Sequence, residues 1–406
     1  MKGLKNEIIG NCLVQEHFDV IIIGGGIIGS SIAYFLAAQQ EFHGSILVVE
    51  KDPTYTQCST TLSVGGIRQQ FSTPENIEIS KFSATFLKSV KHHLSVDDDE
   101  PDILFQEKGY LFLATEKGHP ILNQNCQLQK SHGVDVILMN PSELQNRFPW
   151  LNVSDLAAGS LGLKNEGWFD PYSLLMAFLR KARSLGVHYR NDEVIGIVHE
   201  KNRVIGARLK NGATVFCHCI VNAAGPRAAM IAKMAGIPDL PVRSRKRFVY
   251  SFQCRSQLPD CPLVIDPSGV YFRPEGENFI CGVSPPEDHD PDCQDFDMDY
   301  HLFDDVIWQT LAHRVPAFES IKRGRSWAGH YEYNIKDQNA ILGFHPEIKN
   351  FIFANGFSGH GLQQAPAVGR AISELITFGS YQSLDLKKFS FERFASGELV
   401  KELNVV

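Results

Sequence analysis

The sequence predicts an α/β protein, α+β overall, in which a Rossmann-like dinucleotide-binding domain is joined to a second domain with an antiparallel sheet. Three observations lead to this fold class. The β-branched run 20–23 leads directly into a Gly-x-Gly-x-x-Gly turn over residues 24–29. A second apolar run, 45–50, ends in an acid about 20 residues after the last glycine. Residues 247–283 contain three β-rich runs separated by Pro and Gly turns, which is typical of a separate antiparallel sheet.

The glycine turn indicates a phosphate site, for reasons that differ at each glycine. Gly24 permits the tight turn, Gly26 lets a pyrophosphate approach the backbone, and Gly29 lets the next helix pack on the strand. We expect that helix over 27–39, with its positive N-terminal end facing the phosphates. Glu50 is then placed to accept hydrogen bonds from the adenosine ribose, and its charge repels the 2′-phosphate of NADP.

An ordinary glycine loop beside a charged strand end is the alternative to this interpretation. The order of strand, turn, helix, strand and acid argues against it. The turn alone is satisfied equally by NAD and by FAD.

Composition narrows the class of protein. The chain has 406 residues, 43% apolar and 21% charged, which favours a globular protein of two domains. The formal net charge of -7 gives no reason to expect a nucleic-acid partner. The basic cluster over 243–247 is too short to change this, and we interpret it as a solvated entry to a strand.

Targeting and metal signals are weak. The uncharged stretch 20–38 is long enough for a membrane span, but its glycines divide it into a strand and a helix, so no transmembrane segment is predicted. Residues 1–17 have neither the apolar core nor the cleavage site of a secretory signal, and they are a poor transit peptide. The nine cysteines form no Cys-x-x-Cys pair, so we predict reduced thiols and no metal site.

Further elements follow in order along the chain. The predicted helices cover 76–90, a segment capped by Asn140, a segment from Asp170 to about Leu185, and 299–315. A β-meander over 193–219 precedes the buried strand 220–225, and another buried strand covers 351–355. The nucleotide-binding domain is therefore predicted in three pieces (1–98, 167–238 and 325–406), and the second domain in two (99–166 and 239–324).

A second strand, glycine loop and helix occurs near the end of the sequence. Residues 355–361 form the loop, and the helix from Leu362 has an apolar face that includes Val368, Ile372 and Leu375. A second helix N-terminus can stabilise a second electron-rich group, such as the pyrimidine end of a reduced flavin. This loop favours FAD over NAD.

Four motifs carry a family resemblance. The segments 24–29, 59–60, 222–226 and 356–361 together resemble the D-amino-acid oxidase superfamily of FAD-dependent oxidoreductases. Residues 63–71 and 359–370 resemble its branch of sarcosine oxidases, dimethylglycine dehydrogenases and FAD-dependent oxidoreductase domain-containing 1 proteins.

The resemblance implies a fold and an activity. It implies a glutathione-reductase-type FAD-binding domain and a second domain whose large antiparallel sheet lies over the flavin. The implied reaction oxidises the C–N bond of a small amino acid or N-methylamino acid by hydride transfer to flavin N5. A dehydrogenase is favoured over a fast oxidase, with a quinone or an electron carrier as the acceptor.

The resemblance also assigns residues. Those expected at the cofactor are Gly24, Gly26, Ile27, Gly29, Glu50, Lys51, Ser59, Thr60, Gly65, Gly66, Val194, Ala224, Gly225, Gly359, His360, Gly361, Leu362 and Gln363. Those expected to be catalytic, on the substrate side, are Arg68, Arg273, His330, Tyr331 and His360. Each of the latter has a structural alternative: an ion pair for Arg68, a surface strand position for Arg273, loop shaping for His360, and ordinary packing for His330 and Tyr331.

At three positions this sequence differs from the families that it resembles, and the residue roles of those families do not apply there. Sarcosine oxidases hold the substrate carboxylate with a lysine where this chain has Gln363, and our alignment places their oxygen-activating lysine at Ile280. Their flavin-linking cysteine falls near His330, and no histidine occurs in the 59–66 loop where dimethylglycine dehydrogenases attach the flavin. We therefore predict noncovalent FAD, with a histidyl link through His330 left open.

Two rival functions remain at this stage. The first is a protein that keeps FAD structurally and acts in the assembly of a respiratory-chain complex, as links of the resembled subgroup suggest. The second is an NAD-dependent dehydrogenase, which would be colourless. The expected location is the cytoplasm, or the mitochondrial matrix if the source is eukaryotic, with peripheral membrane association left open.

Overall fold

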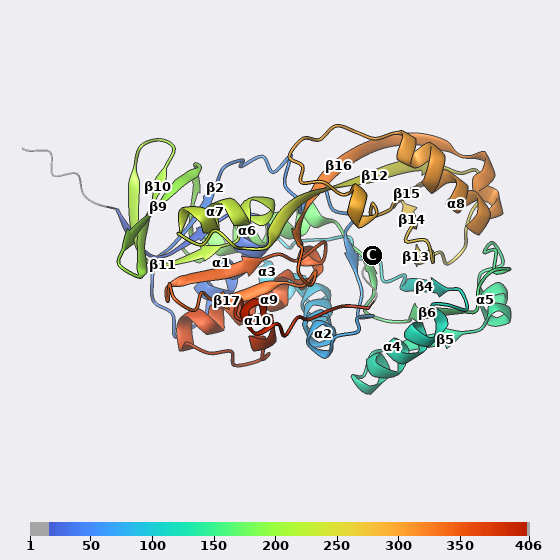
Figure 1. Cartoon of the computed structure of the whole chain (residues 1–406), viewed down its shortest axis with the longest axis horizontal. Helices are drawn as coiled ribbons and strands as arrows, with labels where there is room; N and C mark the ends of the chain where they lie inside the picture. Colours follow the sequence, from blue (N-terminus) through green and yellow to red (C-terminus); the bar gives the residue numbers. More distant parts are fainter. Residues whose placement is uncertain (1–15, 404–406) are drawn as a thin grey trace, which may run out of the picture.

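The computed structural model describes residues 16–403 and contains two eight-stranded sheets. The first sheet has a parallel centre in the order β18-β11-β1-β2-β8, with β17 antiparallel at one edge and the β9–β10 hairpin paired with β11 (Figure 1). Its strands are β1 His17–Ile23, β2 Ile46–Glu50, β8 His188–Asn191, β9 Val194–Glu200, β10 Arg203–Leu209, β11 Thr214–Asn222, β17 Ile341–Phe344 and β18 Phe351–Asn355.

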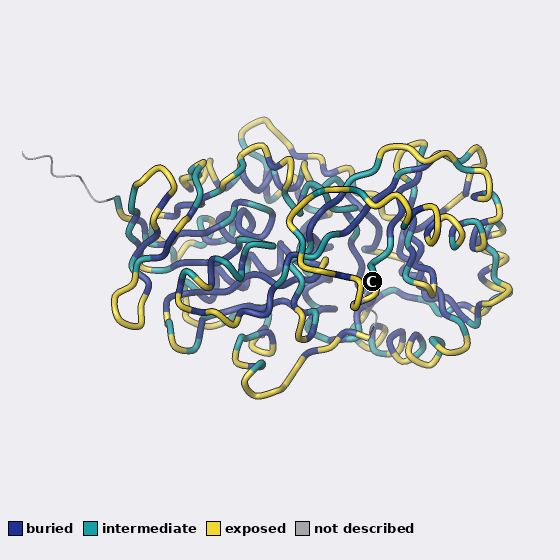
Figure 2. Tube along the Cα trace, turned by 45° about the horizontal axis from the view of Figure 1, so that its top comes forward, coloured by how far each residue is buried: buried dark blue, intermediate teal, exposed yellow. Residues whose placement is uncertain are grey.

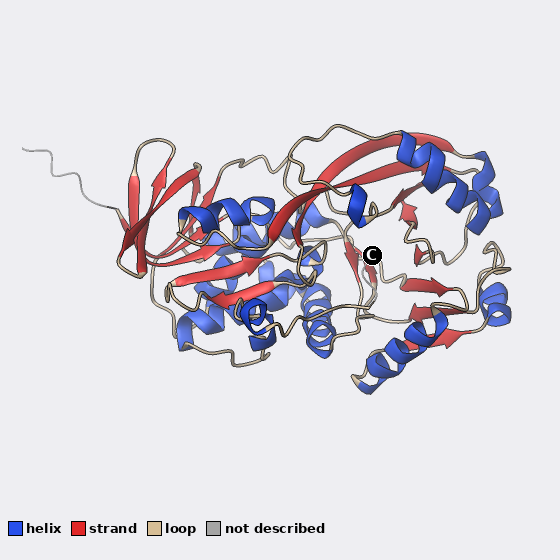
Figure 3. Cartoon of the chain, in the orientation of Figure 1, coloured by secondary structure: helices blue, strands red, loops and turns tan. Residues whose placement is uncertain are grey.

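Helices cover the first sheet (Figure 3). They are α1 Ile27–Ala38, α2 Pro74–Lys88, α3 Val90–Leu94, α6 Pro171–Ser184, α7 Ala228–Met234, α9 Gly361–Phe378 and α10 Arg393–Ser396. The helices α1 and α9 follow the two predicted glycine turns and pack against each other, with the Ser31 hydroxyl donating to the Ala365 carbonyl at 2.8 Å. The close packing brings the first turns of both helices to one end of the sheet.

The second sheet runs in the order β16-β12-β15-β14-β13-β4-β6-β5 and is antiparallel except between β13 and β4. Its strands are β4 Tyr110–Ala114, β5 Val136–Met139, β6 Ala158–Gly162, β12 Val242–Gln253, β13 Leu263–Ile265, β14 Tyr271–Glu275, β15 Asn278–Gly282 and β16 Lys322–Asn334. The helices α4 His119–Ser131, α5 Pro141–Arg147 and α8 Trp308–Arg314 accompany it. A small separate sheet pairs β3 Gly66–Ile67 with β7 Gly167–Trp168.

The predicted helix starts are present. Asn140 and Glu143 form a reciprocal capping box at α5, and the Asp170 carboxylate accepts backbone hydrogen bonds from Tyr172 and Ser173 at α6. The helix expected over 299–315 is interrupted by a π-helical turn at Phe303–Ile307 before α8.

The predicted fold class is confirmed, but the predicted boundary at residue 325 falls inside β16. The whole of β16 pairs with β12, from Val242 opposite Asn334 to Gln253 opposite Lys322. The pairing of β12 with β16 extends the second sheet as far as Asn334. Both strands are long enough to continue from one domain into the other. The other domain limits stay a prediction.

Buried residues run through the interior of both parts of the molecule (Figure 2), and their side chains form separate clusters. One cluster lies between the first sheet and α1, α6 and α9, another packs α7 on the opposite side, and a third belongs to the second sheet. Among the described residues no helix has the length and apolarity to cross a bilayer. Most of the 1–17 leader lies outside the described residues.

Candidate active site

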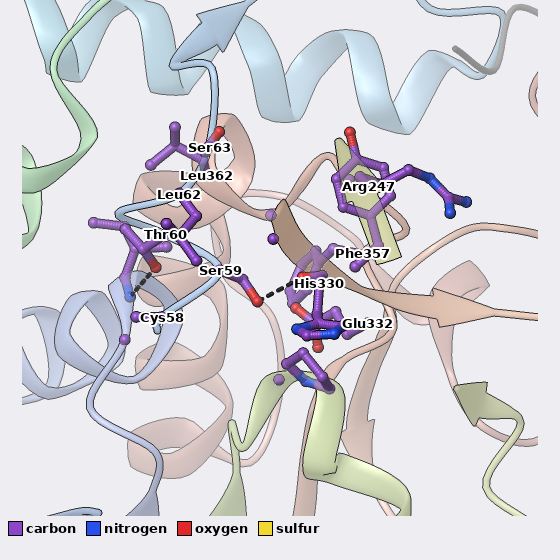
Figure 4. A pocket seen from close by; sticks show the side chains of 18 of the residues that line it. Cys58, Ser59, Thr60, Leu62, Ser63, Arg247, His330, Glu332, Phe357 and Leu362 are labelled. Atoms are coloured by element: carbon purple, nitrogen blue, oxygen red, sulfur yellow. Dashed lines mark hydrogen bonds between the residues drawn. The ribbon is translucent and has the colours of Figure 1, made fainter. Parts of the chain in front are cut away.

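A cavity of about 660 Å³ is lined by residues of both sheets. Most of the predicted site residues line it, although they come from widely separated parts of the chain (Figure 4). The predicted residues that line it are Gly24, Gly26, Ile27, Glu50, Lys51, Ser59, Thr60, Gly66, Arg68, Ala224, Gly225, His330, Tyr331, Gly359, His360, Gly361, Leu362 and Gln363. We call the part near Gly24, Glu50 and Thr60 the α1 end, and the part near Arg68, Tyr331 and His360 the α9 end.

The glycine turn at the α1 end is required by close backbone contacts. Gly24 has φ +102°, and a Cβ there would lie 2.3 Å from the Ala223 carbonyl oxygen. A Cβ on Gly29 would lie 1.9 Å from the Gly24 carbonyl oxygen, so this glycine lets α1 pack rather than lining the cavity. A Cβ on Gly26 would meet only Cys58 Sγ at 3.4 Å and Thr60 Oγ1 at 3.5 Å. Gly26 therefore leaves space that a phosphate can fill.

Side chains of Glu50, at the end of β2, and of Thr60, in the loop after it, hold this turn in place. The Glu50 carboxylate accepts hydrogen bonds from the Gly25 and Asp52 backbone N–H groups, each at 2.8 Å. The Ile27 N–H donates to Thr60 Oγ1 at 3.1 Å, and Ser59 Oγ donates to the His330 carbonyl at 2.6 Å (Figure 4). Thr60 thus holds the start of α1, while Ser59 connects this end to β16.

Arg68 is the buried cation at the α9 end, with 3% of its surface exposed. Its backbone N–H donates to Gln363 Oε1 at 2.9 Å, and its guanidinium carbon lies 4.5 Å from the centre of the Phe71 ring. Its Nη2 lies 3.0 Å from Nε2 of His360. Because a guanidinium only donates, His360 Nε2 accepts this hydrogen bond.

His360 is held neutral. Burial, together with the charge of Arg68, lowers the pKa of His360 to about 3. A neutral ring whose Nε2 already accepts from Arg68 is suited to orienting Arg68 and not to removing a proton from a substrate. The loop-shaping alternative fits this residue better than the catalytic prediction.

Four consecutive residues of β16 reach the cavity: Gly329, His330, Tyr331 and Glu332. The Tyr331 ring packs so closely on the glycine loop that a Cβ on Gly359 would lie 2.4 Å from Tyr331 Cε2. Glu332 accepts from the Gly356 N–H at 3.0 Å, and burial raises the pKa of Glu332 to about 8.

His330 presents an unused nitrogen. Its ring packs edge-on to Phe296 with 4.6 Å between centroids, and burial lowers the pKa of His330. Its buried Nε2 has no hydrogen-bond partner in the described part of the chain, although His330 lines the cavity. A bound group with a polar atom can satisfy this nitrogen.

The basic cluster over 243–247 does not have the solvated role that we expected. Arg247 forms two 2.8 Å hydrogen bonds with the Asp290 carboxylate, and the two residues are 8% and 7% exposed. Lys246 pairs with Asp295 at 2.6 Å. These pairs hold the segment 284–297, which contributes cavity-lining residues, against β12. The sequence shows that the first segment is basic and the second acidic, but not that they meet.

Arg273 is a correction to the predicted substrate side. It does not line the cavity. Its Nε and Nη2 donate to the Val64 carbonyl at 3.0 and 2.6 Å, and its Nη1 donates to the carbonyl of Pro274 at 2.7 Å. Arg273 therefore fixes the backbone of Val64, which does line the cavity.

Three other residues also lie outside the lining. Gly65, with φ +76°, lets the backbone approach Phe169, and Val194 is 4% exposed in the core while its neighbour Glu193 lines the cavity. Ile280 is 2% exposed on β15 and does not line the cavity, so its alignment with an oxygen-activating lysine has no support in the geometry.

Residues that the sequence analysis missed form an apolar and aromatic wall. They come from β4, β12, β13 and β14 and are Tyr110, Phe248, Leu263, Ile265 and Tyr271. Their strands were partly visible in the sequence, but no motif marks which face of each strand lines the cavity.

The sequence pattern of the family described as FAD dependent oxidoreductase, DAO, matches residues 19–375. The chain belongs to this family. The predicted resemblance is therefore confirmed, and the protein is an FAD-dependent oxidoreductase with FAD as its cofactor.

Relatives within the family differ in how much of their length is shared. FAD-dependent oxidoreductase domain-containing protein 1 of Xenopus laevis is 46% identical over 97% of this chain and 86% of that protein. Mitochondrial sarcosine dehydrogenase of Homo sapiens is 24% identical over 93% of this chain but only 41% of that protein.

Solved structures of the family share the fold. L-proline dehydrogenase from P. horikoshii has a TM-score of 0.84 and 29% identity. The match covers 95% of this chain and 100% of that one. Glycine oxidase from Geobacillus kaustophilus has a TM-score of 0.80 at 23% identity, covering 93% of this chain and 99% of that one, which supports the fold alone.

The residues present fit the cofactor of this family. The glycine turn leaves room for phosphates at Gly26, the starts of α1 and α9 both face the cavity, and His330 Nε2 awaits a partner. When bound, FAD accepts two electrons and a proton, or a hydride, from a substrate. Within 16–403, no group of three or more His, Cys, Asp or Glu side chains is placed to hold a metal ion.

Proposed function

We propose that this FAD-dependent oxidoreductase oxidises the C–N bond of a small amino acid or N-methylamino acid, with hydride transfer to flavin N5. The observation that carries the proposal is the buried guanidinium of Arg68 at the α9 end, in a cavity that is also lined by aromatic and aliphatic side chains. A buried guanidinium binds a carboxylate through two parallel hydrogen bonds. The activities named for two similar proteins, sarcosine dehydrogenase and L-proline dehydrogenase, support amino-acid oxidation.

Each residue at the α9 end then has a defined task. Arg68 binds the substrate carboxylate, while Gln363 and His360 hold Arg68 through its backbone N–H and its Nη2. A buried cation also disfavours a second positive charge nearby, so the bound amine is held neutral with its lone pair available. The apolar wall excludes water until the imine product leaves and is hydrolysed.

The cavity also favours a dehydrogenase over a fast oxidase. Among its described lining residues Lys51 is the only lysine, and it follows Glu50 at the α1 end. A lysine ammonium beside the flavin would stabilise the superoxide that forms during reaction with oxygen. We propose a quinone or an electron-carrier protein as the acceptor.

Anaerobic flavin bleaching tests the proposed reaction. Sarcosine, N,N-dimethylglycine, L-proline and glycine are added to the purified yellow protein, with acetate as the control that lacks an amine. We expect at least one amine to remove the flavin absorbance and acetate to leave it in place. An unbleached flavin throughout a broad amine panel would contradict the proposed reaction.

We also propose that the FAD is bound without a covalent link. Ser59 engages the backbone of His330, and the neutral His330 ring is held by Phe296, which suits a hydrogen bond between Nε2 and the cofactor. Acid precipitation separates the alternatives: the yellow colour should remain in the supernatant. Colour that stays with the denatured protein would show a covalent link.

A second candidate is a protein that retains FAD but turns over little. Gln363 favours it, because the amide that replaces a lysine of sarcosine oxidases accepts from the Arg68 backbone instead of contacting a substrate. Such a protein would act through partners, and the expected place is the mitochondrial matrix, in contact with a membrane complex. Recovery of a stable respiratory-chain partner by affinity purification, together with an unbleached flavin, would favour this candidate.

A further inference from the structure

The segment after α10, residues 397–403, returns to the middle of the molecule. Figure 1 draws it in red, running past α2 toward the space between the two sheets. Its anchor is buried: the Val400 N–H donates to Asp337 Oδ2 at 3.0 Å, and the Val400 carbonyl accepts from Asn339 Nδ2 at 2.9 Å. Asp337 in turn holds Arg393 of α10 through two hydrogen bonds of 2.7 and 2.9 Å. The segment is therefore docked by a specific polar network.

Glu402 is the buried acid of this segment, with 8% of its surface exposed. Its Oε2 accepts from both the N–H and the hydroxyl of Ser72, each at 2.7 Å. Its Oε1 accepts from Asn76 Nδ2, also at 2.7 Å. These donors lie at the start of α2, where the N-cap Thr73 makes no side-chain cap of its own, so Glu402 supplies the missing negative group.

The same donors lead to the α9 end of the cavity by two routes. Ser72 is four residues after Arg68 in one loop, and the Arg68 carbonyl accepts from Ser80 Oγ of α2 at 2.5 Å. Asn76 Oδ1 accepts from Gln364 Nε2 at 3.0 Å, and Gln364 is the neighbour of Gln363, which holds the Arg68 N–H. Glu402 thus supports both sides of Arg68.

Charge adds to this geometry. Desolvation lowers the pKa of Arg68, and Glu402 is among the acids that oppose the effect, along with Glu166. Glu166 is fully buried and burial raises its pKa to about 7, so near neutral pH its negative charge is partial. Among residues 16–403, the hydrogen-bond partners of the Glu402 carboxylate are donors of Ser72 and Asn76.

We infer that Glu402 is a positioning residue of the active site: it anchors the loop that carries Arg68 and offsets part of the Arg68 charge. The 397–403 segment then contributes to the active site by positioning the loop that carries Arg68. The inference rests on the proposed function in one respect, namely that Arg68 binds the substrate carboxylate.

Two opposite substitutions separate position from charge in the FAD-loaded full chain. Glu402→Gln keeps an acceptor for Ser72 and removes the negative charge, so acetate, the probe, should bind about threefold tighter or more and the flavin midpoint potential should rise. Glu402→Asp keeps the charge but withdraws the carboxylate from Ser72 and Asn76, so acetate should bind about threefold weaker or more. The matched control is Glu398→Gln, at an exposed glutamate of the same segment.

Binding is measured from the change in the visible flavin spectrum, and melting temperature is recorded in parallel. Opposite shifts in acetate affinity for the two variants support the inference. Affinities for both variants within a factor of two of the control, even with a lower melting temperature, overturn it and leave a structural role only. If Glu402→Gln does not fold, the direction and size of the Glu402→Asp change decide in the same way.

The two proposals fail differently. If acetate leaves the spectrum of the unaltered protein unchanged, the role of Arg68 as carboxylate anchor fails, which counts against the proposed function. The flavin midpoint potential then decides the role of Glu402: a rise in Glu402→Gln but not in Glu398→Gln supports it, and equal potentials overturn it.

Discussion

The two ends of the cavity are built in different ways. The α1 end is a backbone structure, in which Gly24 and Gly29 make close contacts, Gly26 leaves open space, and Glu50 fixes the turn within one stretch of sequence. The α9 end is assembled from side chains of Arg68, His360 and other residues that are far apart in the chain. The backbone of the α1 end is therefore encoded locally, whereas the α9 end depends on how distant segments meet.

The largest expected effect tests the α1 end with two glycines of one turn. Gly29→Ala places a Cβ against the Gly24 carbonyl, so we expect a loss of about 3 kcal/mol or more in unfolding free energy. Gly26→Ala fills only open space, so the FAD-free protein should keep its melting temperature while FAD binding weakens about 100-fold. Urea unfolding measures the loss of stability, and FAD titration measures the loss of affinity. If Gly29→Ala and Gly26→Ala lower the free energy of unfolding equally, the assignment of Gly29 to helix packing and of Gly26 to phosphate approach is wrong.

The next effect concerns substrate binding at the α9 end. Arg68→Met removes the buried guanidinium, and we expect kcat/KM for the best bleaching substrate to fall by roughly 1,000-fold while FAD stays bound. Arg68→Lys should recover little, because an ammonium lacks the planar pair of donors. Rapid-mixing reduction of the flavin measures the change, and full activity in Arg68→Met would remove Arg68 from the site.

A buried glutamate, Glu166, and an exposed one, Glu116, are expected to differ in their effect on the pH dependence of stability. Glu166 accepts from Gln69 N at 2.7 Å and Gln70 Nε2 at 2.8 Å, and burial raises its pKa from 4.5 to about 7. The unfolded chain releases this proton first, so Glu166 should lower the free energy of unfolding by up to about 3 kcal/mol as pH rises from 4.5 to 7. Glu166→Gln should flatten this slope, measured by urea unfolding at pH 5 and pH 8, and the exposed control Glu116→Gln should retain it.

The smallest effect tests the contact between the two ends. Ser59→Ala removes the hydrogen bond to the His330 carbonyl, so stability should fall by about 1 kcal/mol and FAD affinity should change by less than about threefold. Differential scanning calorimetry and FAD titration measure both quantities. A large loss of FAD with unchanged stability would mean that Ser59 acts on the cofactor directly.

The strand, turn and helix of the α1 end could be predicted from the sequence because their determinants are neighbours in the chain. The strand, the glycine turn and Glu50 follow one another closely in the sequence, so together they indicate the start of α1. The second glycine loop indicates the start of α9 in the same way. Arg273 shows where such prediction stops: a strand position was visible, but its side chain turns to Val64 and away from the cavity.

Pairing between distant segments carries no local signal either. The contact of Arg247 with Asp290, and of Glu402 with Ser72, depends on how β12 and α2 are placed in the fold. Tyr110 and Tyr271 belong to the cavity wall for the same reason, since only the assembled second sheet brings both of them to one side.

The paired strands β12 and β16 have a mechanical consequence. Their ladder runs from Val242 opposite Asn334 to Gln253 opposite Lys322, with a single register irregularity between Tyr250 and Phe252. A hinge between the two domains would have to bend this ladder and break its hydrogen bonds, which makes rotation of whole domains costly. We therefore expect substrate to enter by movement of the 284–297 segment. Its attachments to β12 include the ion pairs with Lys246 and Arg247 and an isolated bridge between Asp292 and Arg245, and these can open while the β12–β16 ladder stays paired.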